Sequence, residues 1–526
     1  MSTEGHGDWK QRESWRSALA QVAVVAVLLG GAVTYFVHRG GVRQQAEEHL
    51  RAARAAALRG NPGDLERAVK ELDALFQVDE DSRDAQALAA DIQTVLWLEH
   101  RQPGADARAR EHLSRAEQLE SRSGERYGAR ALHLIAEGKA ADAETYLADL
   151  QAQGATSPRL TLALAFTLQA RGDLPGARQA FARAAEVAWR DPRFTTAYGE
   201  ALLDEGQYAQ AVEAFQRATS VNPDHLLAVL GEGLAQAYQG KKPEVSRRAL
   251  ELARQRQAEL TPVLRARASA LRAELALVGG ALDEAVQASD EAVKSVPDDV
   301  YALFSRARVL AARKAPEARA AFQAAVTRRR TAPLLYLDGA RILQSAGDGA
   351  GALSLLDAYE NTFRPVQVTT ADGKKVGLLE QDGRYWLARG QLLLTADRQD
   401  DALAAFDKAI AARGVGLARA QYAKGALLVA RKDYEGAKAL LTLVAPDTGA
   451  GTLPEAYAAM GDVLFAQSAY AAGCQHYYFG LMRAHAQGAP REELAARIDS
   501  VKKGLEAAGQ GTMAKAWVSE TGALLQ

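Results

Sequence analysis

A fixed spacing of 34 residues is the feature of this sequence that most limits how the chain can fold. Gly138, Gly172 and Gly206 each stand at the junction between two amphipathic stretches, and they are 34 residues apart. The segment 192–225 shows the unit clearly, with one amphipathic stretch on each side of Gly206 and Pro223 near its end. A period of this length predicts stacked pairs of helices, in which each pair buries its apolar face against its neighbours.

The unit 192–225 resembles the tetratricopeptide repeat (TPR). That family places small residues where two helices touch and large apolar residues between them. The residues that fit these positions are Tyr198, Gly199, Gly206, Tyr208, Ala211, Phe215, Ala218 and Pro223. Thr195 and Leu202 depart from the pattern, which has a large residue and an aromatic residue there. The resemblance implies an all-α, right-handed solenoid of about 12 helical hairpins, with the first helix of each unit forming the concave wall.

The phase of the repeat divides the chain into segments. We expect degenerate repeats over 43–123, a TPR array over 124–364 and its continuation over 383–487. Residues 490–526 contain apolar residues at helical spacing, and we expect them to cover the open end of the last hairpin, as a repeat array requires.

A short segment, 365–382, interrupts the helical pattern. Val366 and Val368 alternate with polar residues, Asp372 and Gly373 form a turn pair, and Val376 resumes the alternation. This pattern predicts a β-hairpin-like insertion. It is either a flexible excursion or an edge that a partner strand could extend.

The N-terminus has a different composition. Residues 1–16 form a polar tail, and residues 17–37 contain no charged side chain. A helix of this length would cross a hydrocarbon core of about 30 Å, so we expect a transmembrane helix over 17–37. A cleaved signal peptide and a buried core helix are the alternatives.

The charges that flank this segment are nearly balanced. Three basic residues precede it and four follow it over a similar distance: Lys10, Arg12, Arg16, Arg39, Arg43, Arg51 and Arg54. A short leading tail usually stays inside while a long domain is exported. We therefore expect a single-pass protein of the bacterial inner membrane with the TPR body in the periplasm, and a cytoplasmic body is the alternative.

Composition and motifs exclude several classes of function. The net charge of −1 argues against a general nucleic-acid binder, which needs a basic surface, so we expect no nucleic-acid partner. The single cysteine, Cys474, excludes an internal disulfide framework. Cys474 and His485 would be about 16 Å apart along one predicted helix, too far to share a metal ion. No catalytic motif is present, so we expect no catalysis, no cofactor and no metal site.

Two groups of residues are candidates for partner binding. Arg308 and Arg341 occupy the same position in successive units, and two adjacent guanidinium groups suit a carboxylate or phosphate. They could equally pair within the protein. An apolar group on the expected concave wall suits a peptide or helix, or it packs against the neighbouring unit. Its members are Leu387, Leu394, Tyr422 and Val429.

The resemblance implies a scaffold. We expect a membrane-anchored TPR protein, held by residues 17–37, that binds proteins or peptide segments in its groove within a bacterial envelope complex. The alternative is a chaperone-like accessory factor that presents client proteins to an enzyme system, such as cytochrome maturation, lipopolysaccharide or secretion machinery.

Overall fold

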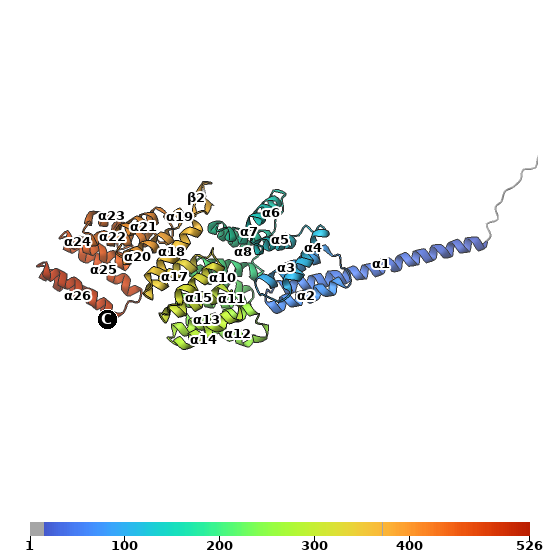
Figure 1. Ribbon diagram of the computed structural model, residues 1–526, viewed down its shortest axis with the longest axis horizontal. Helices are drawn as coiled ribbons and strands as arrows, with labels where there is room; N and C mark the ends of the chain where they lie inside the picture. Colours follow the sequence, from blue (N-terminus) through green and yellow to red (C-terminus); the bar gives the residue numbers. More distant parts are fainter. Residues whose placement is uncertain (1–14, 371, 526) are drawn as a thin grey trace, which may run out of the picture.

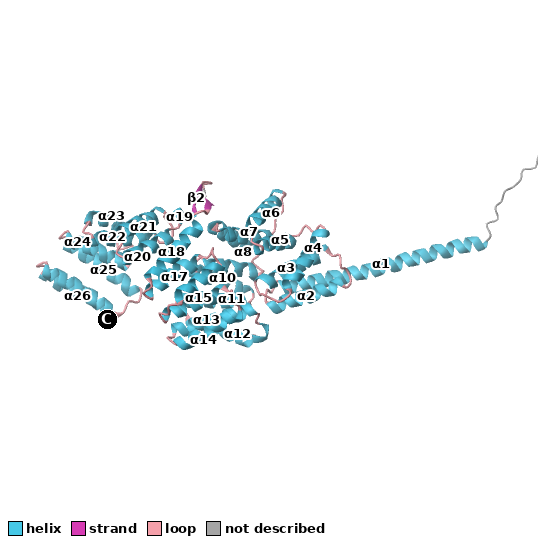
Figure 2. Cartoon of the chain, viewed as in Figure 1, coloured by secondary structure: helices cyan, strands magenta, loops and turns pink. Residues whose placement is uncertain are grey.

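The computed structural model describes residues 15–370 and 372–525, and these residues form an all-helical, solenoid-like array (Figures 1 and 2). Consecutive helices pack against each other in pairs along the chain. The first helices of the pairs are α1 (Trp15–Ala57), α3 (Arg83–Leu98), α5 (Gly124–Ala136), α7 (Pro158–Arg171), α9 (Pro192–Asp204), α11 (Leu226–Tyr238), α13 (Pro262–Val278), α15 (Val300–Ala312), α17 (Pro333–Ser345), α20 (Gly383–Thr395), α22 (Leu417–Ala430), α24 (Pro454–Ala466) and α26 (Arg491–Ala507). The second helices are α2 (Pro62–Phe76), α4 (Ala105–Gln118), α6 (Ala140–Ala152), α8 (Leu174–Val187), α10 (Tyr208–Val221), α12 (Pro243–Gln255), α14 (Leu282–Ser295), α16 (Ala318–Arg328), α18 (Gly349–Phe363), α21 (Gln399–Ala411), α23 (Tyr434–Val444), α25 (Tyr470–Ala486) and α27 (Gly511–Thr521). Short helical turns lie outside the pairs at α19 (Leu378–Gln381), η1 (Gln257–Glu259) and η2 (Gly522–Leu525).

The N-terminal helix corrects one prediction. Helix α1 runs without a break for 43 residues and projects from the body, and its C-terminal part packs against α2 (Figure 1). None of the helices in the described part of the chain is long and apolar enough to span a membrane. The predicted transmembrane helix over 17–37 is therefore wrong, because these uncharged residues are the first half of a longer helix and not an element of their own. The predicted tail 1–16 lies outside the described residues up to position 14.

The unit 192–225 shows why the sequence folds into pairs. The carboxylate of Asp191 caps α9 by accepting a hydrogen bond of 3.1 Å from the backbone N–H of Arg193, and Pro192 occupies the first helical position. Gly206 has φ of +71° in the turn that leads to α10, a conformation that glycine adopts without steric cost. Gly138 and Gly172 have the same left-handed conformation, with φ of +78° and +85°. The regular glycine spacing is therefore a regular spacing of turns.

Phe215 joins two successive units. The ring is fully buried between α9 and α11. A Cβ atom on Gly199 of α9 would lie 2.7 Å from the ring, and one on Gly231 of α11 would lie 2.6 Å from it. The absence of side chains at these two positions therefore lets both helices approach the ring directly.

We predict that Gly231→Ala lowers the free energy of unfolding by about 1–3 kcal/mol, because the added methyl group overlaps the Phe215 ring. In a Phe215→Leu background the same substitution should cost clearly less, because the smaller side chain leaves room. Urea unfolding of the four proteins measures this coupling. An unchanged cost in both backgrounds would contradict the packing described here.

The insertion 365–382 contains strands β1 (Gln367–Thr369) and β2 (Lys375–Gly377), which pair antiparallel with Val368 opposite Val376. The side chain of Val368 is buried in the main core. A Cβ atom on Gly172, in the α7–α8 turn, would lie 3.1 Å from Cγ2 of Val366. The base of the hairpin is thus packed against the body of the array.

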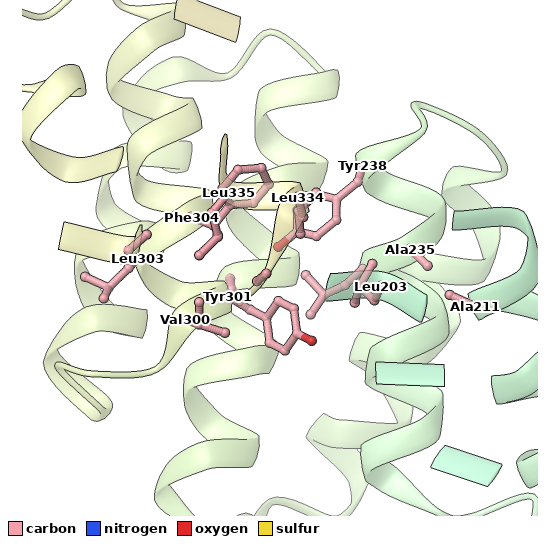
Figure 3. Packing of buried hydrophobic residues seen from close by; sticks show 14 of the residues in the cluster. Leu203, Ala211, Ala235, Tyr238, Val300, Tyr301, Leu303, Phe304, Leu334 and Leu335 are labelled. Carbon is pink, nitrogen blue, oxygen red and sulfur yellow. The ribbon is translucent and has the colours of Figure 1, made fainter. Parts of the chain in front are cut away.

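Units that are far apart in sequence are also in contact. The side chain of Asn222 donates a hydrogen bond of 2.7 Å to the carbonyl of Arg59, and the N–H of Leu226 donates one of 3.0 Å to Oδ1 of Asn61. Farther along, Tyr208 donates to the carboxylate of Asp338. Figure 3 shows part of the main core, in which Leu203 of α9, Tyr301 of α15 and Leu334 of α17 lie together. Several of these units line a cavity that is open to the surface.

Candidate functional site

The inner faces of successive first helices line a cavity of about 600 Å³, here called the inner cavity. Helices α3, α5, α7, α9, α11 and α13 all contribute side chains to it, and the segments 296–300 and 328–331 complete the wall. The lining includes apolar residues from several of these elements: Val95, Leu98, Leu132, Ile135, Phe166, Leu227, Val263 and Val296. It also includes six arginines and five carboxylates, namely Arg101, Arg193, Arg267, Arg328, Arg329, Arg330, Glu99, Glu200, Asp204, Asp298 and Asp299. The cavity thus has both apolar and strongly charged surface.

Part of this charge is neutralised within the wall. The buried carboxylate of Asp204 accepts a hydrogen bond of 2.8 Å from Arg329 and one of 2.9 Å from the hydroxyl of Tyr301. Arg101 pairs with Asp298 at 3.2 Å. Buried charges of opposite sign that share hydrogen bonds fix the relative positions of the helices that carry them. The hydrogen bonds of the buried Asp204 therefore help to hold α9 against α15 and against Arg329, which follows α16.

Three other buried side chains keep nitrogen atoms without a hydrogen-bond partner. Arg193 binds Asp191 through Nε at 2.9 Å and Nη2 at 2.6 Å, and its Nη1 has no partner. Arg267 contacts Glu200 through Nη1, and its Nε makes no hydrogen bond but lies 3.9 Å from the carboxylate of Asp299. Both ring nitrogens of His225 are also unpartnered, and burial lowers the pKa of this imidazole to about 4. All three residues line the inner cavity.

Glu99 lies in this wall just after α3, and its carboxyl group has a raised pKa. Burial raises the pKa of its carboxyl group to about 7, and the nearby carboxylate of Glu200 adds to this rise. The folded protein therefore takes up a proton at Glu99 in a range where the unfolded chain would have lost it.

This shift has a consequence for stability. Between pH 4.5 and about 7 the folded state binds more protons at Glu99 than the unfolded state does, so this residue's contribution to stability falls as pH rises. We predict that Glu99→Gln gains stability relative to the wild type by about 2 kcal/mol between pH 5 and pH 8, after allowance for solvent screening. Thermal unfolding of both proteins across this range provides the measurement. A difference that is independent of pH would show that Glu99 is ionised throughout.

The structure separates the two arginines predicted to bind an anion. Nε of Arg308, on α15, donates to both carboxylate oxygens of Glu274 at 3.0 Å, and its side chain is only 12% exposed. The guanidinium group also lies 5.1 Å from the ring centroid of Tyr238. Arg341, on α17, is 61% exposed and lies 3.7 Å from Asp338. Arg308 is therefore paired internally, whereas Arg341 is accessible beside a small pocket between α17 and α20.

The four predicted apolar residues lie on α20 and α22 and differ in exposure. Leu387 is buried in a core cluster. Tyr422 and Val429 are half-buried against the cluster formed by α23 and α24, and Leu394 is 37% exposed. Three of these side chains, Leu394, Tyr422 and Val429, therefore keep surface that a partner could contact. Leu387 is buried and contributes to the core.

Sequence reasoning missed Arg193 and Arg267 as cavity residues. Each stands second in its unit, 192–225 or 266–299, and Arg159 stands second in the unit 158–191. By resemblance to the TPR family this position belongs to the concave wall. A basic residue recurring at one wall position was therefore the available signal.

Comparison with known proteins matches residues 196–225 to the tetratricopeptide repeat family. No curated protein sequence matches the chain. Among solved structures, the human IFIT1 dimer with PPP-AAAA is similar with a TM-score of 0.42 and 17% identity, over 78% of this chain and 93% of that chain. The APC/C hetero-tetramer Cut9-Hcn1 has a TM-score of 0.39 and 12% identity, over 88% of this chain and 96% of that chain. The chain therefore contains a tetratricopeptide repeat over 196–225 within an all-helical array.

Proposed function

We propose that the chain is a TPR scaffold that binds a protein partner and performs no catalysis of its own. The observation that supports this proposal is the contact between the first helices of successive pairs. Helices α9, α11, α13, α15 and α17 touch in order, as do α20, α22 and α24. Side chains on these helices form continuous walls that are long enough to follow an extended peptide or a helix.

The second of these walls is where we place the partner. Leu394 and Tyr422 offer apolar surface on α20 and α22, and Arg341 offers an accessible charge on the adjoining α17. Apolar anchors flanked by an accessible arginine suit an amphipathic segment that carries an acidic residue.

Site-specific crosslinking tests this proposal. A photoreactive amino acid is placed in the full chain at Tyr422 or Leu394, and the matched control carries it at Lys438, an exposed position on the second helix α23. We expect one protein to be captured at the two wall positions and not at Lys438. The captured protein should then form a stoichiometric complex with the purified chain, and this complex should be lost in Tyr422→Glu. Equal capture at Lys438, or no capture at either wall position, would contradict the proposed surface.

The same experiment separates the scaffold from the accessory role. A stable complex with one protein is the outcome expected of a scaffold, whereas brief capture of many different proteins is expected of a factor that presents clients. The bacterial envelope and periplasmic setting stays a prediction from the resemblance, and the segment 17–37 no longer supports it. Cell fractionation of the full chain measures the location directly.

A further inference from the structure

We propose that the inner cavity binds a small organic anion, a compound that carries a carboxylate or phosphate group on an apolar body. Arg193 and Arg267 would bind the anionic group, and the apolar part of the wall would cover the body. This site is separate from the partner surface on α20 and α22, and it does not depend on the proposed scaffold function.

The unpartnered donors indicate an anion. Arg193 and Arg267 are each more than nine-tenths buried, yet Nη1 of Arg193 and Nε of Arg267 have no hydrogen bond. Leaving a buried donor unsatisfied costs about 1–3 kcal/mol, and more for a charged group. Carboxylate and phosphate oxygens are the acceptors that guanidinium groups bind best. A bound anion would therefore accept a hydrogen bond from such a donor and offset this desolvation cost.

Two of the side chains with unpartnered nitrogens, Arg193 and His225, lie side by side in the cavity wall. A Cβ atom on Gly60 would lie 2.8 Å from Cγ of Arg193 and 3.1 Å from Cε1 of His225, so both side chains pack against the same backbone. Arg267, on α13, contacts Glu200, which lies about two turns along α9 from Arg193. Residues from α9, from α13 and from the turn before α11 thus supply nitrogen atoms to the wall of this cavity.

Most carboxylates of the wall are paired with arginines, which reduces their repulsion of an anionic ligand. Asp204 is paired with Arg329, Glu200 is paired with Nη1 of Arg267, and the carboxylate of Asp299 lies 3.9 Å from Nε of Arg267. Near neutral pH the carboxyl group of Glu99 is partly protonated, so it can donate a hydrogen bond to an anion. Most of the negative charge near these donors is therefore balanced by the arginines of the wall or by protonation, and Nη1 of Arg193 is the donor with no carboxylate hydrogen bond of its own.

The remaining wall argues for an organic body rather than a bare ion. Leu132 and Ile135 of α5, Phe166 of α7 and Leu98 of α3 line the cavity. The volume of about 600 Å³ lies within the range typical of small-molecule sites.

Thermal unfolding of the full chain with defined probes tests the proposal. The probes are octanoate and octyl phosphate, with octylammonium and inorganic phosphate as controls for the apolar body and the anionic group. We expect octanoate, octyl phosphate or both to raise the midpoint in a concentration-dependent way, because a ligand that binds the folded state stabilises it. The two anions distinguish a carboxylate site from a phosphate site. An equal shift with octylammonium or with inorganic phosphate, or no shift with either anionic probe, would overturn the proposal.

Variants locate the site. Ala136 and Ala170 line the cavity and are exposed, so a tryptophan at either position should fill the space without disturbing the core. We expect Ala136→Trp and Ala170→Trp to abolish the shift, and Ala152→Trp, at an exposed position on α6 outside the cavity, to retain it. Arg193→Gln should weaken binding about tenfold or more. If Arg193→Gln does not fold, the cavity-filling variants still decide the question, and an undiminished shift in both of them would contradict the site.

Discussion

Replacing Arg308 with methionine is expected to lower the free energy of unfolding by about 3–5 kcal/mol. Methionine keeps most of the side-chain volume but leaves the carboxylate of Glu274 without its partner. Glu274 is fully buried on α13, so water cannot replace the lost guanidinium group. The variant also loses the contact of Arg308 with the ring of Tyr238.

A second substitution should recover much of this loss. In the double variant Glu274→Gln, Arg308→Met no buried charge remains, so we expect it to be more stable than Arg308→Met alone. The matched control is Arg341→Met, which should change stability by less than about 0.5 kcal/mol because its side chain is largely exposed. Repeat arrays can unfold in parts, so hydrogen exchange at α13 and α15 should accompany the chemical unfolding curves. Equal effects of the Arg308 and Arg341 substitutions would show that the buried pair does not stabilise the fold.

Phe215→Ala is the second substitution with a large expected effect, a loss of about 3–5 kcal/mol. The ring is fully buried, and Gly199 and Gly231 have no side chains that could move into the vacated space. The cavity left behind would lie between α9 and α11, so both units should lose protection against hydrogen exchange.

The control for this prediction is Val187→Ala, at the exposed end of α8, which should change stability by less than about 0.5 kcal/mol. A loss below about 1 kcal/mol for Phe215→Ala would mean that the neighbouring helices collapse onto the space. Such a result would contradict the rigid packing between units.

Much of the fold could be predicted because residues within each repeat determine its turn and its buried face. Gly206 specifies the turn through its conformation, and Phe215 specifies the face that both neighbouring helices must bury. The prediction for segment 17–37 was wrong because it rested on composition, the lack of charged residues. Composition does not show where a helix ends, and the helix that contains this segment continues to Ala57. Contacts such as Asn61 with Leu226 could not be predicted, since they depend on the curvature accumulated over several units.

The candidate site shows the same division. The position of Arg308 in its repeat predicts that it lies on the inner face, but it does not show whether an acidic residue of the protein pairs with it. Glu274 stands 34 residues earlier, at the same position of the preceding unit, and this spacing could have indicated the ion pair. No sequence pattern indicated that Nη1 of Arg193 lacks a partner. Asp191 stands two residues earlier and binds Arg193, but only the folded structure shows that it leaves Nη1 without a hydrogen bond.

The position of Phe215 decides where this protein can be shortened. A fragment that ends at His225, the last residue of the repeat as the sequence defines it, lacks Gly231 and would leave one side of the aromatic ring in water. A fragment that ends after Tyr238 retains all of α11 and keeps that side covered. A stable fragment that includes this repeat should therefore end one helix beyond the repeat boundary that the sequence defines.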